Sequence, residues 1–595
     1  MMMLAAFLLP LAAVAVIASA GAAVPAAAHR VRRATAIAAP LTTVPAALLC
    51  VFDAGARLEV PWLLFGSEFH LDPAARALTL ITALLYGAAL MAVSWAKLRD
   101  AEKGSGALSA FLLLCFVGNI GTYVAADAVS FYLAFALMSF SAVGLVIHYR
   151  SQEARRATRI YLIMSVVSET AILAGLILTA SAGGYRVADA PAAVADSEFT
   201  TLIVVLLLIG FGVKAGTVPL HVWLPLAHPA APPAASAVLS GAMVKAGLVG
   251  WLRFLPLGEM AMLAVGYTLL GLALLGAFAA AVVGVLQRDP KVVLAYSTIS
   301  QMGFITALPA VGLLVPELAS ATITAAVLYA VHHGLAKGAM FLGVPVMKHF
   351  GTGRTRWLVA AGLVGAGLAV AGAPLTSGAY GKYVSKETVE GITFVGADLY
   401  DLLPLVATGS TVLLMRFGWL LWSAERHPEH RPAGELASWL LVCAAGIAVP
   451  WLVGMHWLGA GGFSWEAGPL WDATWPLLLG LAVGSGVWLL SARGWLPGWV
   501  ERADGSALQP GDLVVAEESV GAQTAQGAAS VLEAAHQGAT TVRESALGLV
   551  TRWGDRAEGA IDGGERRLAP WAASGAAVLV VLTGSLLLLA GGWLL

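Results

Sequence analysis

Two lysines, Lys214 and Lys245, lie inside apolar stretches of the segment from 210 to 254. Placing a lysine in the hydrocarbon of a membrane costs roughly 3 kcal/mol or more, so such a residue indicates a functional site by default. Prolines interrupt the sequence between the two lysines, beginning at Pro219. Proline removes an amide donor, and irregular backbone at membrane depth survives only inside protein or beside a wet cavity. The segment therefore predicts a buried, hydrated polar site.

A second group of titratable residues occurs in VLYAVHHGLAKGAMFLG, where Tyr329, His333 and Lys337 follow one another at intervals of four. Residues with this spacing share one face of a helix. Histidine titrates near neutral pH and a desolvated lysine can be shifted toward it, so this face predicts a proton relay, with His332 beside it. The alternative is a structural histidine, but two titratable groups on one face of an apolar span favour the relay.

Lys382 and Glu169 are the remaining charged candidates. Lys382 follows an apolar stretch that Pro374 interrupts. The alternative for this lysine is an amine that reaches the membrane surface from a helix end. Glu169 is a single acid well inside the apolar stretch from 158 to 181. An acid at that depth needs a partner, which makes it a further candidate for the polar site.

The composition sets the class of protein. Of 595 residues, 59% are hydrophobic and 12% are charged, against about 25% charged in soluble proteins. We therefore predict an all-α polytopic membrane protein, and the net charge of −1 gives no argument for nucleic acid. The three cysteines fit no disulfide framework or metal site and no nucleotide-binding motif is present, so no cofactor and no metal are predicted. Haem between paired histidines is an alternative that the neighbouring lysine disfavours.

Apolar runs of about 20 residues predict about 16 transmembrane helices. The runs are 3–24, 35–54, 77–96, 107–126, 128–148, 158–181, 199–219, 233–254, 261–286, 291–313, 318–346, 357–381, 402–423, 436–457, 474–492 and 570–594. The first run could also be a signal peptide, but it lacks a basic start, which favours a retained helix. Basic residues follow the odd-numbered runs, which predicts a cell inner (plasma) membrane location with both termini outside.

The seventh and twelfth runs are both broken by proline and lie five runs apart, so they cross the membrane in opposite directions. Paired broken helices are typical of transport sites in inverted halves. The predicted divisions are N-terminal helices at 1–106, inverted five-helix repeats at 107–254 and 261–425, C-terminal helices at 436–499, an amphipathic region at 500–569 and a final anchor at 570–595. A helical apolar stripe predicts one long lateral helix over 515–567, whereas the glycines there favour a partly flexible loop.

Four segments together resemble the proton-conducting antiporter family. They are KAGTVPLHVWLPLAHPAAPPAASAVLSGAMVKAG, DPKVVLAYSTISQMGF, HHGLAKGAMFLG and GAPLTSGAYGK. The family comprises the antiporter-like subunits of respiratory complex I, the large subunits of Mrp-type cation/proton antiporters and the membrane subunits of group 4 hydrogenases. The resemblance covers residues 60–425, and the twelfth run with its lateral region is similar to the distal complex I subunit, NADH dehydrogenase subunit 5.

The resemblance implies a role for each candidate residue. Lys214 matches the lysine of the first half-channel and Lys245 a lysine of the central axis. His333 and Lys337 match the bridge between half-channels, and Lys382 matches the terminal lysine of the second. Glu169 falls where some relatives carry an acid. The supporting positions are Tyr329, His332 and Ser240, and Ser240 stands where several relatives have histidine.

One departure from the family pattern affects the first half-channel. The fifth run of relatives carries a glutamate that pairs with the seventh-run lysine, but this sequence has Phe135 and Ala136 there. Lys214 then loses that partner, unless Glu169 replaces it through water. Two functions stay open. One is a proton-translocating subunit, with Na⁺ left open, in a complex I-like, Mrp-like or hydrogenase-like assembly. The other is a non-pumping coupling or scaffold subunit, as in a bicarbonate-uptake or hydrogenase-like complex. Neither reading gives the chain a redox active site of its own.

Overall fold

The computed structural model describes residues 1–22, 25–64, 66–99, 105–426, 434–501 and 508–511. Residues 1–13 and 36–511 form the main compact unit, and residues 14–35 group apart from it. The elements up to the first broken helix are α1 (Met2–Ala22), α2 (Pro25–Ala38), η1 (Ala39–Thr43), α3 (Val44–Phe52), β1 (Arg57–Val60), β2 (Ser67–His70), α4 (Pro73–Arg99), α5 (Ser105–Val124), α6 (Ala128–Val146), α7 (Gln152–Ser181), α8 (Ala190–Ala195) and α9 (Thr200–Ala215).

The later elements include the second broken helix and two π-helical turns, η2 and η4. They are α10 (Trp223–Ala230), α11 (Pro233–Val238), η2 (Leu239–Met243), α12 (Val244–Phe254), α13 (Leu263–Val285), α14 (Pro290–Leu314), η3 (Pro316–Leu318), α15 (Ala319–Phe350), α16 (Thr355–Ala371), α17 (Ser377–Thr388), β3 (Thr393–Phe394), β4 (Ala397–Asp398), α18 (Leu399–Ser423), α19 (Gly434–Leu452), η4 (Val453–Trp457), α20 (Ala467–Ala492) and α21 (Gly498–Glu501).

The predicted polytopic helical class is confirmed. Within the described ranges, 13 helices are long and apolar enough to cross a membrane, and α9 and α16 are shorter apolar helices. Together these 15 helices correspond, in order along the chain, to the first fifteen predicted runs. The predicted anchor at 570–595 and the lateral helix over 515–567 lie outside the described residues. The two inverted repeats stay a prediction.

Both predicted helix breaks are present. Helix α9 ends in Gly216 at φ 69°, and α16 ends in Gly372 at φ 87°. Glycine adopts this left-handed conformation without the Cβ penalty, which makes it the common helix-terminating residue. Pro219 and Pro374 follow within three residues and cannot continue a helical hydrogen-bond ladder. Each broken span therefore exposes a backbone terminus inside the bundle.

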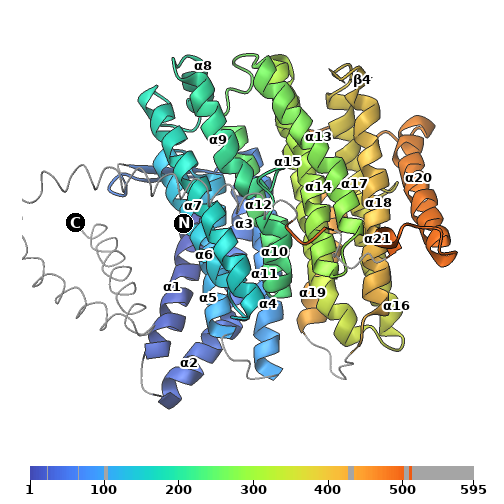
Figure 1. Cartoon of the computed structure of the whole chain (residues 1–595). Coiled ribbons are helices and arrows are strands. Elements are labelled where there is room, and N and C mark those ends of the chain that lie inside the picture. Colours follow the sequence, from blue (N-terminus) through green and yellow to red (C-terminus); the bar gives the residue numbers. More distant parts are fainter. Residues whose placement is uncertain (23–24, 65, 100–104, 427–433, 502–507, 512–595) are drawn as a thin grey trace, which may run out of the picture. The chain divides into compact units, whose positions relative to one another are not determined.

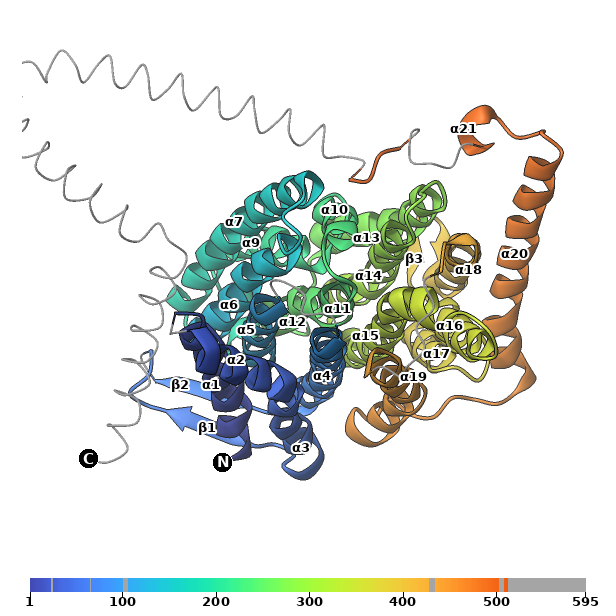
Figure 2. The same ribbon diagram turned by 90° about the horizontal axis from the view of Figure 1, so that it is seen from below.

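Helix α14 forms the centre of the main unit, because every residue from Val292 to Leu314 is buried. Figure 2 shows α11, α12, α14 and α15 surrounded by the other helices, with α20 at the periphery. Glycines permit close backbone packing in this region. A Cβ on Gly303 of α14 would lie 2.6 Å from the carbonyl oxygen of Ala273 in α13. A Cβ on Gly247 of α12 would lie 2.4 Å from the carbonyl oxygen of Phe211 in α9. Small residues at such crossings are typical of membrane helix bundles.

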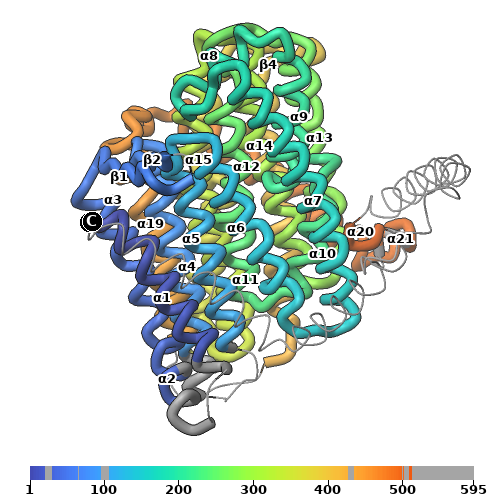
Figure 3. The backbone as a smooth tube through the Cα atoms, turned by 90° about the vertical axis from the view of Figure 1, so that its left-hand side faces the viewer, coloured from blue at the N-terminus to red at the C-terminus, as the bar shows by residue number. Residues whose placement is uncertain are grey.

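The connections divide between two ends of the main unit. Helix α8 and strand β4 lie at one end (Figures 1 and 3), while α16 begins at the other (Figure 1). Near the first end, the β1–β2 hairpin is fixed by Asp127, the N-terminal cap of α6. Its carboxylate accepts the Ser130 amide at 2.7 Å and the Glu68 amide at 2.9 Å. The hairpin and the start of α6 are thus held together by one buried carboxylate.

Candidate functional site

Lys245 and His333 are in direct contact at the centre of the bundle. The Lys245 amine lies 2.8 Å from His333 Nδ1 and donates to the Ser240 carbonyl at 2.6 Å. Both side chains are fully buried. A charged lysine can only donate, so with Lys245 protonated His333 Nδ1 is the acceptor and the proton of the neutral ring sits on Nε2. That Nε2 has no partner among the described residues.

The π-helical turn η2 shapes this contact. In that turn the Val244 amide bonds to the Leu239 carbonyl, five residues back instead of four. The Ser240 carbonyl of the same turn accepts the Lys245 amine. The Ser240 hydroxyl lies 2.8 Å from the Thr298 hydroxyl and so connects the turn to α14. Single π-turns inside helices occur often at functional sites.

Lys337 lies one helical turn beyond His333 on α15 and is fully buried. Its amine donates to the Leu294 carbonyl of α14 at 3.2 Å. Tyr329, one turn on the other side of His333, is hydrogen-bonded to Gln301 of α14 at 2.5 Å. The predicted face of α15 therefore exists, and all three of its polar side chains point toward α12 and α14.

His332 points in another direction, toward the second broken helix. Its Nδ1 lies 2.9 Å from the hydroxyl of Ser377, the first residue of α17, and that hydroxyl donates to the Gly446 carbonyl at 2.9 Å. The single Ser377 proton is thus used, so His332 Nδ1 is the donor and a neutral ring leaves Nε2 bare. The adjacent histidines accordingly face the two sides of α15, one toward Lys245 and one toward α17.

Lys382 of α17 binds the end of the preceding half-helix. Its amine donates to the Ala371 carbonyl at 2.8 Å. A Cβ on Gly372 would lie 2.7 Å from Lys382 Cδ and 3.3 Å from its amine. Lys382 is hydrogen-bonded at the helix break, in contrast to the alternative of an amine that reaches for the membrane surface.

Lys214 is held by hydroxyl groups of α7. Its amine donates to Ser165 at 2.7 Å and to Tyr161 at 3.1 Å, and it lies 4.5 Å from the centre of the Tyr161 ring. Both of these partners are neutral hydroxyls, so they do not replace the carboxylate that the family pattern places in the fifth run. Phe135, at one of the two departing positions, is buried and packs against Phe211 with ring centres 5.5 Å apart.

Glu169 continues the polar stripe that Tyr161 and Ser165 begin on α7, at the same interval of four residues. Its side chain is buried, and neither carboxylate oxygen has a hydrogen-bond partner among the described residues. Ser165, which accepts a hydrogen bond from the Lys214 amine, lies one helical turn from it, roughly 6 Å. The α7 stripe therefore carries an acid near the lysine, on a different helix from the one that the family pattern uses.

The geometry brings Lys245, His333 and Lys337 together, and it connects His332 to the helix of Lys382. Lys214 and Glu169 form a separate group between α7 and α9. The sequence interpretation missed four partners of these residues, namely Tyr161, Ser165, Gln301 and Ser377. Tyr161 and Ser165 carried a usable signal, because they repeat every four residues with Glu169. In the part of the chain that the structure describes, no three His, Cys, Asp or Glu side chains converge as a metal site.

Comparison with known proteins gives the family. Residues 125–385 match the family model described as NADH:quinone oxidoreductase/Mrp antiporter, TM. This stretch of the chain belongs to that antiporter family. The matched stretch contains all the charged candidates, from Glu169 of α7 to Lys382 of α17.

Three similar proteins illustrate the range of relatives. An uncharacterized protein of Mycobacterium tuberculosis is 37% identical over 247 residues, which are 40% of this chain and 36% of that protein. Hydrogenase-4 component B of Escherichia coli is 27% identical over 419 residues, 65% of this chain and 62% of the relative. The Mrp complex of Dietzia has a chain with a TM-score of 0.70 at 21% identity, covering 89% of this chain and 60% of that one. The chain thus spans less than two thirds of each relative, and the structural match establishes the fold.

Proposed function

We propose that this chain is an ion-translocating subunit of a multi-subunit membrane complex and moves protons through buried lysines and histidines. The observation that carries the proposal is the Lys245–His333 contact of 2.8 Å. At that distance a protonated Lys245 can pass its proton to His333 Nδ1, which leaves a neutral amine that can accept the next proton. Hydrogenase-4 component B and the chain of the Mrp complex, both similar to this chain, support a complex of membrane subunits.

The proposed relay runs from Lys214 to Lys245 and His333, then to Lys337, and ends at Lys382. Tyr329 and His332 support it through their bonds to α14 and α17. Buried polar atoms without protein partners, such as His333 Nε2 and the Glu169 oxygens, favour water between the charged groups. A change of one pKa unit corresponds to about 1.4 kcal/mol. A small movement of a neighbouring charge can therefore change the proton affinity of one group enough to pass its proton to the next.

The membrane orientation follows from the basic residues. Four helix connections contribute residues to the wall of one cavity. These residues include Tyr149 after α6, Lys291 after α13, Lys348 at the end of α15 and Arg426 after α18. Their positive residues support placing this end on the inner side of the plasma membrane. The N-terminus is then outside, as is the C-terminus if the sixteenth span exists.

The test is replacement of Lys337 by methionine in the intact complex, reconstituted into liposomes. We expect loss of ion movement with unchanged co-purification of partner subunits. Arg186→Gln, which removes an exposed ion pair with Glu68, is the control and is expected to behave as the parent complex. Wild-type ion movement by an assembled Lys337→Met complex would refute the proposal, and replacing H⁺ gradients by Na⁺ gradients in the same vesicles identifies the ion.

A second candidate is a coupling or scaffold subunit that does not pump. It is favoured by the aromatic packing of Phe135 and by Ala136 at the position of the family glutamate. Ala136→Glu distinguishes the two functions. If Ala136→Glu moves more ions than the wild-type complex, the first half-channel is inactive in the wild-type chain. If the wild-type complex is already active and the variant moves ions at the same rate, Glu169 replaces the missing acid.

A further inference from the structure

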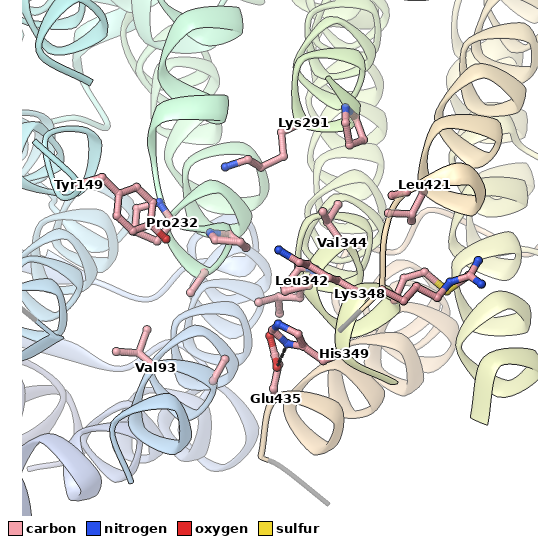
Figure 4. Close-up of a pocket in the computed structure, with 18 of the residues that line it drawn as sticks. Val93, Tyr149, Pro232, Lys291, Leu342, Val344, Lys348, His349, Leu421 and Glu435 are labelled. Atoms are coloured by element: carbon pink, nitrogen blue, oxygen red, sulfur yellow. Dashed lines mark hydrogen bonds and ion pairs between the residues drawn. The ribbon is translucent and has the colours of Figure 1, made fainter. Parts of the chain in front are cut away.

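A cavity of about 550 Å³ lies where the α10–α11 junction meets the ends of α14, α15 and α18 (Figure 4). Its wall includes Pro232, Lys291 and Lys348, and His349 bonds there to Glu435 at 2.9 Å. The cavity thus combines apolar walls with several charged groups. It lies at the end of the bundle that the basic connections assign to the inner side.

Lys291 connects this cavity to the α10–α11 junction. Its amine donates to the Pro229 carbonyl at 2.9 Å and to the Ala231 carbonyl at 2.8 Å. A helix would satisfy the Pro229 carbonyl with the amide four residues on, but residue 233 is proline and has no amide hydrogen. Lys291 therefore compensates for the proline break and fixes the backbone next to His228.

His228 lies directly behind that junction and is fully buried. Neither of its ring nitrogens has a hydrogen-bond partner among the described residues. Its ring stacks on Phe341 of α15 with centres 4.5 Å apart, and Phe341 is one turn beyond Lys337. A buried polar group without a partner costs about 1–3 kcal/mol, so its presence requires an explanation beyond packing.

The step from the cavity to Lys337 is short. Lys291 lines the cavity, and Leu294, whose carbonyl binds the Lys337 amine, is three residues further along α14. Three residues of α-helix span about 4.5 Å along the axis. The cavity wall and the centre of the relay are thus separated by about one helical turn along α14. His228 adjoins both, because it precedes Pro229, whose carbonyl binds Lys291, and stacks on Phe341, one turn beyond Lys337.

We infer that His228 transfers protons between the inner cavity and Lys337, so that the second half of the relay has its own inlet. The imidazole accepts a proton on one nitrogen and releases one from the other, and the ring then returns to its starting tautomer by rotation or exchange. No other bond changes. This inference rests on the proposed function, and it makes conduction through Lys337 and Lys382 independent of Lys214.

The test compares His228→Phe with Lys337→Met in the reconstituted complex. Phenylalanine keeps the stacking on Phe341 but cannot carry a proton. We expect His228→Phe to assemble with its partner subunits and to lose ion movement on the order of a hundredfold, as for removal of a proton-transfer group. Imidazole added on the cavity side should restore part of the activity. The control is His456→Gln, at an exposed histidine of η4.

The outcomes separate the inference from the proposed function. Normal ion movement by Lys337→Met would refute the proposed function itself. A defective Lys337→Met together with a normal His228→Phe would refute only the inlet. Loss of activity in an assembled His228→Phe complex that imidazole does not restore would show a structural role and also overturn the inlet.

Discussion

Replacement of Gly372 by alanine tests the geometry at the second broken helix. Gly372 has φ 87°, and alanine in the left-handed region costs about 1–2 kcal/mol. The added Cβ would lie 2.7 Å from Lys382 Cδ, so the lysine must move away from the Ala371 carbonyl. Losing a hydrogen bond from a charged group costs about 1.5–3 kcal/mol. We expect a total destabilisation of about 2.5–5 kcal/mol and at least about a tenfold loss of ion movement, the equivalent of 1.4 kcal/mol.

Gly391 provides a matched control for the backbone term. It has φ 80°, close to that of Gly372, but a Cβ there would meet no atom within 4 Å. Gly391→Ala should therefore lower stability by the conformational cost alone and leave ion movement unchanged. Both variants are measured by thermal unfolding of the purified complex and by ion movement in liposomes. Equal losses in the two variants would refute the assignment of Lys382 to the Ala371 carbonyl.

Four further substitutions probe the helix contacts, and each is measured by thermal unfolding of the purified complex. Asp127→Ala removes the α6 cap and should cost about 1–2 kcal/mol without affecting ion movement; a neutral result would contradict the capping role. Tyr161→Phe keeps the ring near Lys214 but removes its hydroxyl, so we expect a loss of about 1–2 kcal/mol, and an unchanged melting temperature argues against the bond. Gln301→Leu leaves the buried Tyr329 hydroxyl without its partner, at about 1–3 kcal/mol, which an equally stable variant would disprove. Gly247→Ala adds a methyl group at the close α9–α12 crossing and should lower the free energy of unfolding by about 1–3 kcal/mol; an unchanged melting temperature would contradict the close packing.

The broken helices could be predicted because their cause is local. Gly216 and Gly372 are followed within three residues by proline, and a glycine followed by proline ends a helix whatever surrounds it. That Lys245 and His333 belong to a buried polar site could also be predicted, since charged groups are rare in apolar spans. Their contact could not, because 88 positions separate them and nothing in either segment specifies the other.

Other features of the site depend on tertiary packing. The π-turn at Ser240 has no sequence mark, since small residues such as those of LSGAM are common in any membrane helix. Adjacent residues of an α-helix lie about 100° apart, so the different directions of His332 and His333 follow from the helix itself, whereas their partners Ser377 and Lys245 depend on tertiary packing. His228 sits in a motif that the resemblance includes, but a single histidine gave no reason to separate it from the rest. Its unpartnered nitrogens appear only once α10, α14 and α15 are packed together.

The two helix breaks have an electrostatic consequence for the lysines beside them. An α-helix carries the equivalent of about half a negative charge at its C-terminus. Lys214 lies in the last turn of α9, and the Lys382 amine binds the final carbonyl of α16. Each lysine therefore has a countercharge supplied by the peptide backbone, which neither protonates nor disappears on side-chain replacement. A chain with this arrangement can have alanine at position 136, where the family pattern has glutamate, and still keep a fixed negative potential beside the lysines at both ends of the proposed relay.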